Sequence, residues 1–591
     1  MSPETKLSSQ STRSYESFSA SSLLTGGSSS GPIISDFNEN YAVADLNGYS
    51  KDVPSEQLGS TGPSVTDKDG ASQNRLISVY SAAIIFAFAV TIALILHIYL
   101  GASMVPDDGV LVSDHERCTG LGRGVLRDGG SSVDAAVAAV LCLGVVHPHA
   151  SGVGGGGVMM VHDIRRNQTK VLNFLGTAPK ALTEEMLHGV SELKEGLQVG
   201  VPAMLRGLHR AHRLYGRLKW EDVVARAAAV AREGFSVSSS LAEAISKVKG
   251  QRLSPHFRDL FLPGGRALRS GSLHRMPALA GVLEAGVSGF YNGNVSQEIV
   301  DEVQSNGGVL TREDLSDYTV EVDQPLEGLF NDFIIQVPPS STGAALISAI
   351  SLLHLIGNNT TTNITHQWIL EATGAALAES NGLEEPKYNS SVTKQLSDIL
   401  SKSPAAAPPT RHSSPVNRSQ SVLLGGQVIV MGPDDLMVSV ASSLSGPFGS
   451  RLVTRSGVLL NSLILDFSWP NRASGLRINQ SHRIESGKGP LSPLMPTIVL
   501  PAWNKCGLYM ALSSSGRAGS FTVITQLLID AQNETNCVFS GTRLHPQADA
   551  CLVVQSAQDL HEKTQTSEKS DVRGILRNKD FIKPLDIPVI R

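Results

Sequence analysis

The stretch GGQVIVMGPDDLMVSVASSL, residues 425–444, contains two strand-like runs joined by a turn. QVIVM (427–431) and MVSVASSL (437–444) are rich in β-branched and other apolar residues, which is typical of buried strands. The residues Gly432-Pro433-Asp434-Asp435 between them favour a tight turn. The sequence therefore predicts a buried β-hairpin whose first strand begins at Gly425-Gly426.

Residues 105 to about 395, upstream of this hairpin, alternate between helical and strand-like patterns. Ser131 and Asp134 form a capping box that opens a helix, which AAVAAVLCLGVV (135–146) continues. EDVVARAAAVARE (221–233) predicts an amphipathic helix with acidic residues at its start, and FIIQV (333–337) predicts a short strand. The mixture indicates an α/β fold.

Three segments have the composition of tails or linkers. Residues 1–74 are rich in Ser, Gly, Asp and Thr, and they carry too few apolar residues to offset the entropy of ordering, so we expect disorder. Residues 400–422 are rich in Ser, Pro and Ala and predict a long loop or linker. HEKTQTSEKSDVRGILRNKD (561–580) loses its apolar periodicity and predicts an exposed or irregular tail.

The composition is that of a globular protein, with 41% hydrophobic and 17% charged residues in a chain of 591. The formal net charge is −5, and we find no basic block that could neutralise a row of phosphates. Nucleic acid is therefore not an expected partner.

The glycine-rich run GVGGGG (152–157) follows His147-Pro148-His149. No Gly-Lys-Ser/Thr comes after it, so it does not match a phosphate-binding loop. The glycines predict close packing of the backbone beside the strand GVMMVHDI (157–164). His147 and His149 have no third ligand at a suitable spacing, and we expect neither a metal nor another cofactor.

Five cysteines are too few and too scattered to predict a disulfide framework, and none forms a CxxC pair. Cys142 lies in an apolar helical run and is interpreted as a small buried hydrophobic residue. A bridge among Cys506, Cys537 and Cys551 is possible, and the sequence does not choose one. Cys118 is the remaining cysteine.

LISVYSAAIIFAFAVTIALILHIYL (76–100) contains no Lys, Arg, Asp or Glu and is long enough to cross a bilayer, so we predict an anchor over 75–100. Lys68 and Arg75 precede this run, whereas Asp107 and Asp108 follow it, which favours a cytosolic N-terminus. Every Asn-x-Ser/Thr sequon lies beyond the run. These candidate glycosylation sites are Asn167, Asn294, Asn358, Asn359, Asn363, Asn389, Asn417, Asn479 and Asn533. We predict a single-pass type II membrane protein with an extracellular or lumenal ectodomain.

Several long stretches follow one another in an order that is specific to one family. They are 122–157, 196–220, 290–318 and 447–470, followed by GPLSPLMPT (489–497) and RLH (543–545). In this order the chain resembles the γ-glutamyltransferase (glutathione hydrolase) family of N-terminal-nucleophile hydrolases. VIVMGPDD (428–435) and LDFSWPNR (465–472) are most similar to one branch of it.

The resemblance implies an αββα four-layer sandwich, with two stacked sheets between helical layers. It divides the ectodomain into a large-subunit-like region, 101–424, and a small-subunit-like region, 425–545. Residues 546–591 depart from the family ending, which normally adds strands to the second sheet, so its completion is not expected from this tail.

The resemblance also implies a mechanism. Family members cut their own chain and expose a threonine at the start of a buried strand, whose hydroxyl attacks the γ-glutamyl amide. Gly425 occupies that position here, followed by Gly426 and Gln427. Ser419 and Ser421 are near, but either would need a shift of register to take the threonine's place.

The family's substrate positions are substituted in part. Leu175 stands where an arginine clamps the α-carboxylate of glutamate. Ser445, Leu463 and Asp466 stand where an Asn, a Glu and an Asp meet the α-amino group, so only the aspartate is kept.

Two further pairs complete the comparison. Ser492-Pro493 replaces two serines, and Gly516-Arg517 replaces the glycine pair of the oxyanion hole. Asp466, Ser492, Gly516 and Ser445 are the candidate substrate-binding residues, and the family's nucleophile position, Gly425, carries no nucleophilic side chain. The resemblance implies a glutathione hydrolase acting on γ-glutamyl peptides such as glutathione, or alternatively an inactive relative that serves as a binding or regulatory membrane glycoprotein.

Overall fold

The computed structural model divides the chain into two compact units, Met1–Ile98 and Tyr99–Arg591. The described residues are 80–92, 109–187, 193–339, 342–359, 425–467, 483–503, 507–514, 520, 523–525, 527–528, 572–578 and 581–587. The predicted tail 1–74 and the predicted linker 400–422 lie outside them.

In the first unit, residues 80–92 are helical, and large apolar side chains such as Phe86 and Phe88 are exposed. Within the part of the chain that the structure describes, no helix combines the length and the apolar character that a membrane crossing requires. The predicted anchor 75–100 lies only partly within the described residues.

The first sheet of the second unit has the strand order β1-β9-β10-β2-β3-β6 and is antiparallel throughout. Its strands are β1 (Val110–Ser113), β9 (Gly426–Met431), β10 (Leu436–Ser443), β2 (Gly156–Asp163), β3 (Gln168–Phe174) and β6 (Glu321–Asp323). The predicted hairpin of residues 425–444 is confirmed as β9 and β10, which pair with Val438 opposite Val430. This hairpin occupies the middle of the sheet, so every residue of both strands is buried.

The second sheet has the order β14-β13-β12-β11-β8-β7. Its strands are β14 (Phe581–Ile587), β13 (Val572–Asn578), β12 (Leu508–Ser514), β11 (Thr497–Pro501), β8 (Phe333–Val337) and β7 (Leu326–Phe330). The predicted strand 333–337 is therefore confirmed as β8.

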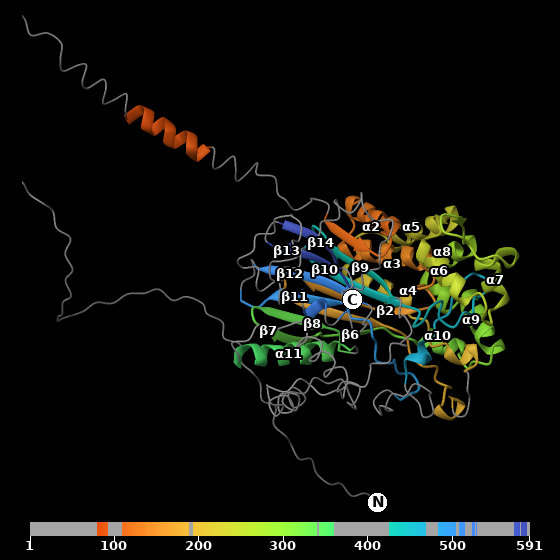
Figure 1. Ribbon diagram of the computed structural model, residues 1–591. Coiled ribbons are helices and arrows are strands. Elements are labelled where there is room, and N and C mark those ends of the chain that lie inside the picture. The colour runs from red at the N-terminus through yellow and green to blue at the C-terminus, as the bar shows by residue number, and fades with distance from the viewer. Residues whose placement is uncertain are drawn as a thin grey trace, which may run out of the picture. The chain divides into compact units, whose positions relative to one another are not determined.

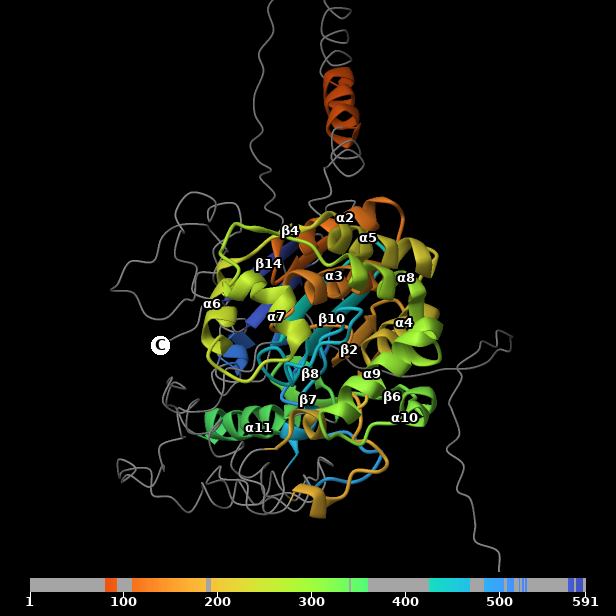
Figure 2. The same ribbon diagram turned by 90° about the vertical axis from the view of Figure 1, so that its right-hand side faces the viewer.

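Helices cover the outer faces of both sheets (Figures 1 and 2). The first sheet is covered by α2 (Glu116–Arg127), α3 (Ser132–Val146) and α4 (Met204–Tyr215), and the second by α11 (Gly343–Asn359). Helix α5 (Trp220–Glu233) packs on α3, and α8 (Pro277–Tyr291) packs on α5 and α4. The remaining helices are α6 (Ser239–Val248), α7 (Pro255–Phe261), α9 (Asn294–Ser305) and α10 (Arg312–Asp317). An apolar layer that includes Met160, Ile429 and Ile498 fills the space between the sheets. The predicted αββα sandwich is confirmed.

Helix α3 is buried along its whole length, and its start is fixed by two carboxylates. The predicted capping box is confirmed: the Ser131 hydroxyl accepts from the Asp134 N–H, and the Asp134 carboxylate accepts from the Ser131 N–H. Asp434, in the turn of the β9–β10 hairpin, accepts from the Ser132 N–H at 2.8 Å and from its hydroxyl at 2.5 Å. A negative charge at a helix N-terminus is stabilising, so this contact docks the hairpin on α3.

Cys142 is buried, as its apolar run indicated, but it is also disulfide-bonded, which was not predicted from the sequence. Cys118 on α2 and Cys142 on α3 form a disulfide with Cα atoms 5.5 Å apart, and both side chains are fully buried. The apolar run around Cys142 indicated its burial, but pairing depends on the packing of α2 against α3, which the sequence does not encode locally. Cys506, Cys537 and Cys551 lie outside the described residues.

The expectation for the C-terminal tail is also wrong, because β13 and β14 complete one side of the second sheet. Two arginines gave β13 its polar appearance in the sequence. Arg573 pairs with Asp114 (Nε to Oδ1, 2.5 Å), and Arg577 pairs with Asp435 (Nη1 to Oδ1, 3.2 Å). Ile575, between them, enters the apolar layer between the sheets.

Candidate functional site

One end of the first sheet carries Gly425, the position at which the resemblance places the nucleophile. The register places Gly426, Ser442, Gly157 and Phe174 side by side across β9, β10, β2 and β3. Gly425 directly precedes β9 and is half-buried. We call this end, defined by these four paired residues and Gly425, the site end.

The start of β9 is closely packed. A Cβ atom placed on Gly426 would lie 2.8 Å from the Ser442 hydroxyl oxygen and 3.2 Å from Ser151 Cβ. The Ser442 hydroxyl donates to the Gly426 carbonyl at 3.1 Å, and the Ser151 and Ser442 hydroxyl oxygens lie 2.8 Å apart. Both serines are buried. The side chains of Ser151 and Ser442 therefore occupy the space that a side chain at position 426 would need.

Asp114 holds the backbone of β9 one residue further on. Its carboxylate accepts from the Gln427 N–H at 2.7 Å and from Arg573 Nε at 2.5 Å. Because Arg573 belongs to β13, the C-terminal strands of the second sheet contribute to the position of the site end.

Leu175 and Leu463 lie on either side of one short backbone segment. Leu175 follows β3 with 7% of its surface exposed, and Leu463 is 1% exposed. A Cβ atom on Gly176 would lie 3.2 Å from Leu463 Cδ2, and one on Gly200 would lie 2.6 Å from it. The two positions expected to bind charged groups therefore carry buried apolar side chains, and we call these two leucines the apolar wall.

Asn461 joins the segments around this wall. Its side-chain oxygen accepts from the N–H groups of Gly200 (2.9 Å) and Leu463 (3.0 Å). Its side-chain NH₂ donates to the carbonyls of Gly154 (2.8 Å) and Gly200 (3.0 Å). Sequence reasoning missed Asn461, because nothing near 461 in the chain indicates that residues 154 and 200 would meet there.

Ser445 and Asp466 lie in the segment that follows β10. Ser445 has a φ of 66°, and Phe448 (61°) and Arg451 (64°) share the left-handed conformation. Residues other than glycine adopt the left-handed conformation only at a cost in free energy. Such strained residues are often found at functional sites. Asp466 is half-buried at the end of a short 3₁₀ turn, Leu463–Asp466. The structure places Ser445 next to the site end, since the Ser445 N–H donates to the Ser443 hydroxyl at 2.8 Å.

Ser492 is buried and turned toward its own backbone. Its hydroxyl accepts from the Leu494 N–H at 2.9 Å, and its carbonyl accepts from the Thr342 N–H at 3.0 Å, just before α11. Pro493 is half-buried. Gly516 and Arg517, together with Ser419 and Ser421, lie outside the described residues, so the oxyanion pair and the alternative serines stay predictions.

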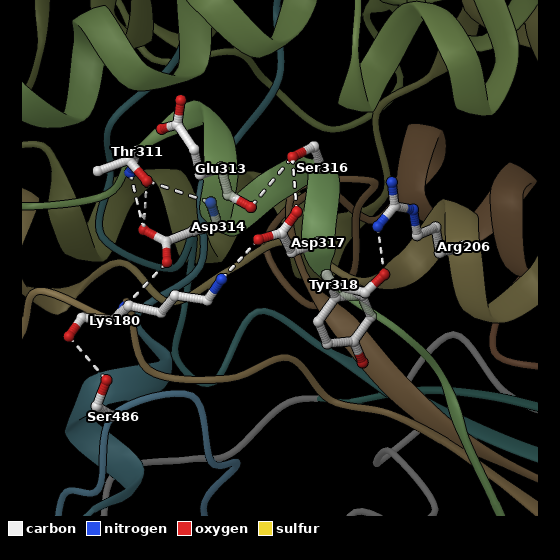
Figure 3. Close-up of polar contacts among 9 residues, drawn as sticks. All are labelled: Lys180, Arg206, Thr311, Glu313, Asp314, Ser316, Asp317, Tyr318 and Ser486. Atoms are coloured by element: carbon white, nitrogen blue, oxygen red, sulfur yellow. Dashed lines mark hydrogen bonds and ion pairs between the residues drawn. The ribbon is translucent and has the colours of Figure 1, made fainter.

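The backbone after Leu175 is held by α10 and by a loop (Figure 3). The Lys180 N–H donates to Asp314 Oδ1 at 3.0 Å, and its ammonium group pairs with Asp317 at 2.6 Å. The Ser486 hydroxyl donates to the Lys180 carbonyl at 2.7 Å. Asp314 also closes a capping box with Thr311, so one buried carboxylate orders both α10 and this segment.

Tyr318, at the end of α10, reaches the same segment. Burial raises the pKa of the Tyr318 hydroxyl above its usual range, although a hydrogen bond with the Gly176 backbone acts in the other direction. Arg206 donates from Nη1 to the Tyr318 carbonyl, and its guanidinium carbon lies 4.3 Å from the centroid of the Tyr291 ring. The hydroxyl is thus neutral, and its hydrogen bond is with the backbone of Gly176, directly after Leu175.

The histidines beside the glycine run stack edge to face. The ring centroids of His115 and His147 lie 5.1 Å apart, as do those of His147 and His149. Among the described residues, no group of three His, Cys, Asp or Glu side chains is arranged to hold a metal ion. The close backbone packing predicted for the glycine run is confirmed at Gly156, where a Cβ atom would overlap the Leu175 carbonyl.

Two candidate glycosylation sites can be placed. Asn167 is exposed in the turn between β2 and β3, and Asn294 is exposed at the start of α9. Asn358 and Asn359 belong to the last turn of α11, and their side chains are not described. Asn363, Asn389, Asn417, Asn479 and Asn533 lie outside the described residues.

Comparison with known proteins agrees with this arrangement. Residues 118–548 match the family model described as Gamma-glutamyltranspeptidase. The chain is 43% identical over 548 residues to Glutathione hydrolase 7 of Homo sapiens, covering 86% of this chain and 82% of that protein. It is 33% identical over 425 residues to Glutathione hydrolase 2 of Arabidopsis thaliana, covering 67% and 73%. The Homo sapiens match bears out the branch that VIVMGPDD and LDFSWPNR indicated.

The fold also matches a solved structure. Cephalosporin acylase from Bacillus halodurans superposes with a TM-score of 0.63 at 20% identity, covering 81% of this chain and 94% of that chain. At this identity the likeness concerns the fold alone, whereas the sequence matches extend through the site end. The protein belongs to the gamma-glutamyltranspeptidase family.

Proposed function

We propose that this chain is a family member that keeps the scaffold but not the acyl-transfer chemistry, and that its ectodomain acts by binding. The observation that carries the proposal is the glycine pair at the start of β9. Neither Gly425 nor Gly426 has a hydroxyl or thiol that could attack an amide. Loss of a nucleophile commonly lowers turnover by a factor on the order of 10⁶.

The register of β9 argues against a substitute nucleophile from the preceding chain. β9 pairs on both sides, with Ile429 opposite Val112 on one side and Ser439 on the other. Moving Ser419 or Ser421 to position 425 would displace every one of these pairs.

The apolar wall supports the same proposal from the side of substrate binding. Leu175 and Leu463 replace an arginine and a glutamate that would meet the charged groups of a γ-glutamyl substrate. Loss of a buried charge partner costs about 3–5 kcal/mol, which is more than a hundredfold in affinity. We expect weak binding of glutathione at this end of the sheet even without turnover.

The test is a denaturing gel of the purified, deglycosylated full-length chain beside a self-cleaving relative, together with an assay of glutamate release. We expect one band and no release above the rate without enzyme. Two fragments joining near 424–425, with glutamate release, would overturn the proposal. Gly425→Thr is a matched variant: cutting in this variant alone would place the defect in the missing hydroxyl.

Active glutathione hydrolysis is the second candidate function. The name of the Homo sapiens relative and the retained Asp466 and Ser492 favour it. It requires the two fragments and the glutamate release that the gel and the assay measure, so the same experiment decides between the candidates.

We also propose that the chain is anchored by residues 75–100, with the second unit outside the cytosol. The uncharged run of 25 residues and the exposed apolar side chains of residues 80–92 support the anchor. The Cys118–Cys142 disulfide supports the orientation, since disulfides persist in oxidising compartments. Protease protection of the second unit in intact vesicles is the expected result, and digestion without detergent would contradict the proposal.

A further inference from the structure

Thr169, on β3, joins the two sheets through its hydroxyl. The Thr169 hydroxyl donates to Gln336 Oε1 on β8 at 2.5 Å, and its oxygen lies 2.8 Å from His162 Nδ1 on β2. The three residues are at most 5% exposed. Gln336 Nε2 in turn donates to the Glu327 carboxylate on β7 at 2.6 Å.

The donor and acceptor of each hydrogen bond in this series can be assigned by starting from the Glu327 carboxylate. An ionised Glu327 only accepts, so Gln336 turns its NH₂ toward Glu327 and its carbonyl oxygen toward Thr169. The Thr169 hydroxyl has one hydrogen, which it gives to that carbonyl. His162 must then donate from Nδ1–H, and the Thr169 oxygen accepts. The hydroxyl is fully used and shielded from solvent.

The same threonine is the third residue of the sequon Asn167-Gln168-Thr169. Asn167 is exposed in the β2–β3 turn with a φ of 50°, a conformation that asparagine tolerates better than most residues. An acceptor site for N-glycosylation requires both the asparagine and the hydroxyl two residues later. In the folded protein the asparagine is accessible and the hydroxyl is not.

We propose that Asn167 carries an N-linked glycan and that the glycan is added before the two sheets close over Thr169. The proposal rests on the extracytoplasmic placement of the second unit proposed above. In the second described sequon the Ser296 hydroxyl is also buried, but it donates to the Gly293 carbonyl (2.7 Å) within one helix cap, so its burial does not depend on the closure of two sheets.

The glycan lies at the end of the first sheet away from the site end. β2 runs for eight residues from Gly156, at the site end, to Asp163, next to the turn that holds Asn167. At a rise of about 3.3 Å per residue this separates the two by roughly 23 Å. A glycan at Asn167 is therefore attached at the opposite end of β2 from the site end.

The experiment compares the full-length chain with three variants made in secretory cells. Site occupancy is read by peptide mass spectrometry, and thermal unfolding is measured after enzymatic removal of glycans. Asn167→Asp is the matched control, because the deglycosylating enzyme itself converts a glycosylated asparagine to aspartate. We expect occupancy in the wild type and in Thr169→Ser, and none in Asn167→Asp or Thr169→Val. After deglycosylation, Thr169→Val should unfold about 2–4 °C below the other three chains.

The outcomes separate this inference from the topology on which it rests. A chain without glycan at any asparagine overturns both. Occupancy at other sequons with a bare Asn167 overturns the inference alone, and so does a Thr169→Val variant that unfolds with the wild type.

Timing is tested on folded chain made under a glycosylation inhibitor and then offered to oligosaccharyltransferase with its lipid-linked donor. It should stay bare at Asn167, while a peptide of residues 160–175 is modified. Modification of the folded chain would overturn the proposed order of events.

Discussion

The two ends of the first sheet are built from different kinds of residue. At the end that carries the β9–β10 turn, Asp434 binds the start of α3, and Asp435 pairs with Arg165 and Arg577. At the site end, a glycine pair opens β9, and Leu175 and Leu463 form the wall. At the turn end, polar side chains hold elements of the fold together, whereas at the site end glycine and leucine stand where the family resemblance implies a nucleophile and charged side chains. Under the function proposed above, the scaffold is maintained without the reaction, and the two depend on opposite ends of one sheet.

Helix α3 is fastened near both of these ends, by Asp434 at its start and by the disulfide toward its other end. The largest expected effect comes from removing the disulfide by Cys118→Ala with Cys142→Ala. The bridge closes a loop with a sequence separation of 24, so its loss should lower the free energy of unfolding by about 3 kcal/mol. Denaturant unfolding of the full-length chain measures this, and equal stability of the two chains would contradict a structural role for the bridge.

Asp434→Ala tests the opposite end of α3. The variant leaves the Ser132 N–H and hydroxyl buried without their acceptor, which should cost about 2–3 kcal/mol in the free energy of unfolding. Asp317→Ala is the control, because its pair with Lys180 is more than half exposed on both sides and should matter little. Similar losses in the two variants would show that the turn does not dock the hairpin on α3.

His162, beside the turn end, makes stability depend on pH. Burial lowers its pKa from 6.5 to about 4 in the folded chain. The unfolded chain therefore binds more protons below pH 6.5, and stability falls as the pH falls through 6.5 toward 4. The loss attributable to His162 should reach about 2 kcal/mol at pH 5. His162→Asn, which can keep the donor to Thr169, should flatten this part of the unfolding profile, and an unchanged slope would assign the dependence to other groups.

The smallest expected effect compares one left-handed residue at each end. Ser445→Gly relieves a φ of 66° and should raise the free energy of unfolding by about 0.5–1 kcal/mol. Asp435→Gly relieves a φ of 58° but also removes the pairs with Arg165 and Arg577, so it should bring no gain. Calorimetry of both variants measures the difference in stability. An equal gain in stability from both substitutions would show that the two ends of the sheet do not differ in this respect.

The parts of the fold that follow from local pattern could be predicted from the sequence. The hairpin, α3 with its capping box, α5 and β8 all follow from periodicity and from residues within a few positions of each other. The C-terminal strands could not, because Arg573 and Arg577 read as polar until Asp114 and Asp435 are placed opposite them. The Cys118–Cys142 bridge likewise depends on how two helices pack.

The candidate site was predictable only through the family resemblance. Gly425, Leu175 and Leu463 become informative when the residues they replace are known, since a glycine or a leucine alone indicates no chemistry. The contacts that order the wall remained hidden, because Asn461 connects segments more than 250 residues apart in the chain.

The position of β9 and β10 in the middle of the first sheet has a practical consequence. The hairpin is interleaved between β1 and β2, both of which precede residue 424, and β11 is paired with β8 in the same way. A break near 424–425 would therefore yield two interlocked polypeptides that migrate together under native conditions. Size-exclusion chromatography cannot report whether the chain has been cut. The same strand pairings join the two regions in an uncut chain, as the binding scaffold proposed above requires.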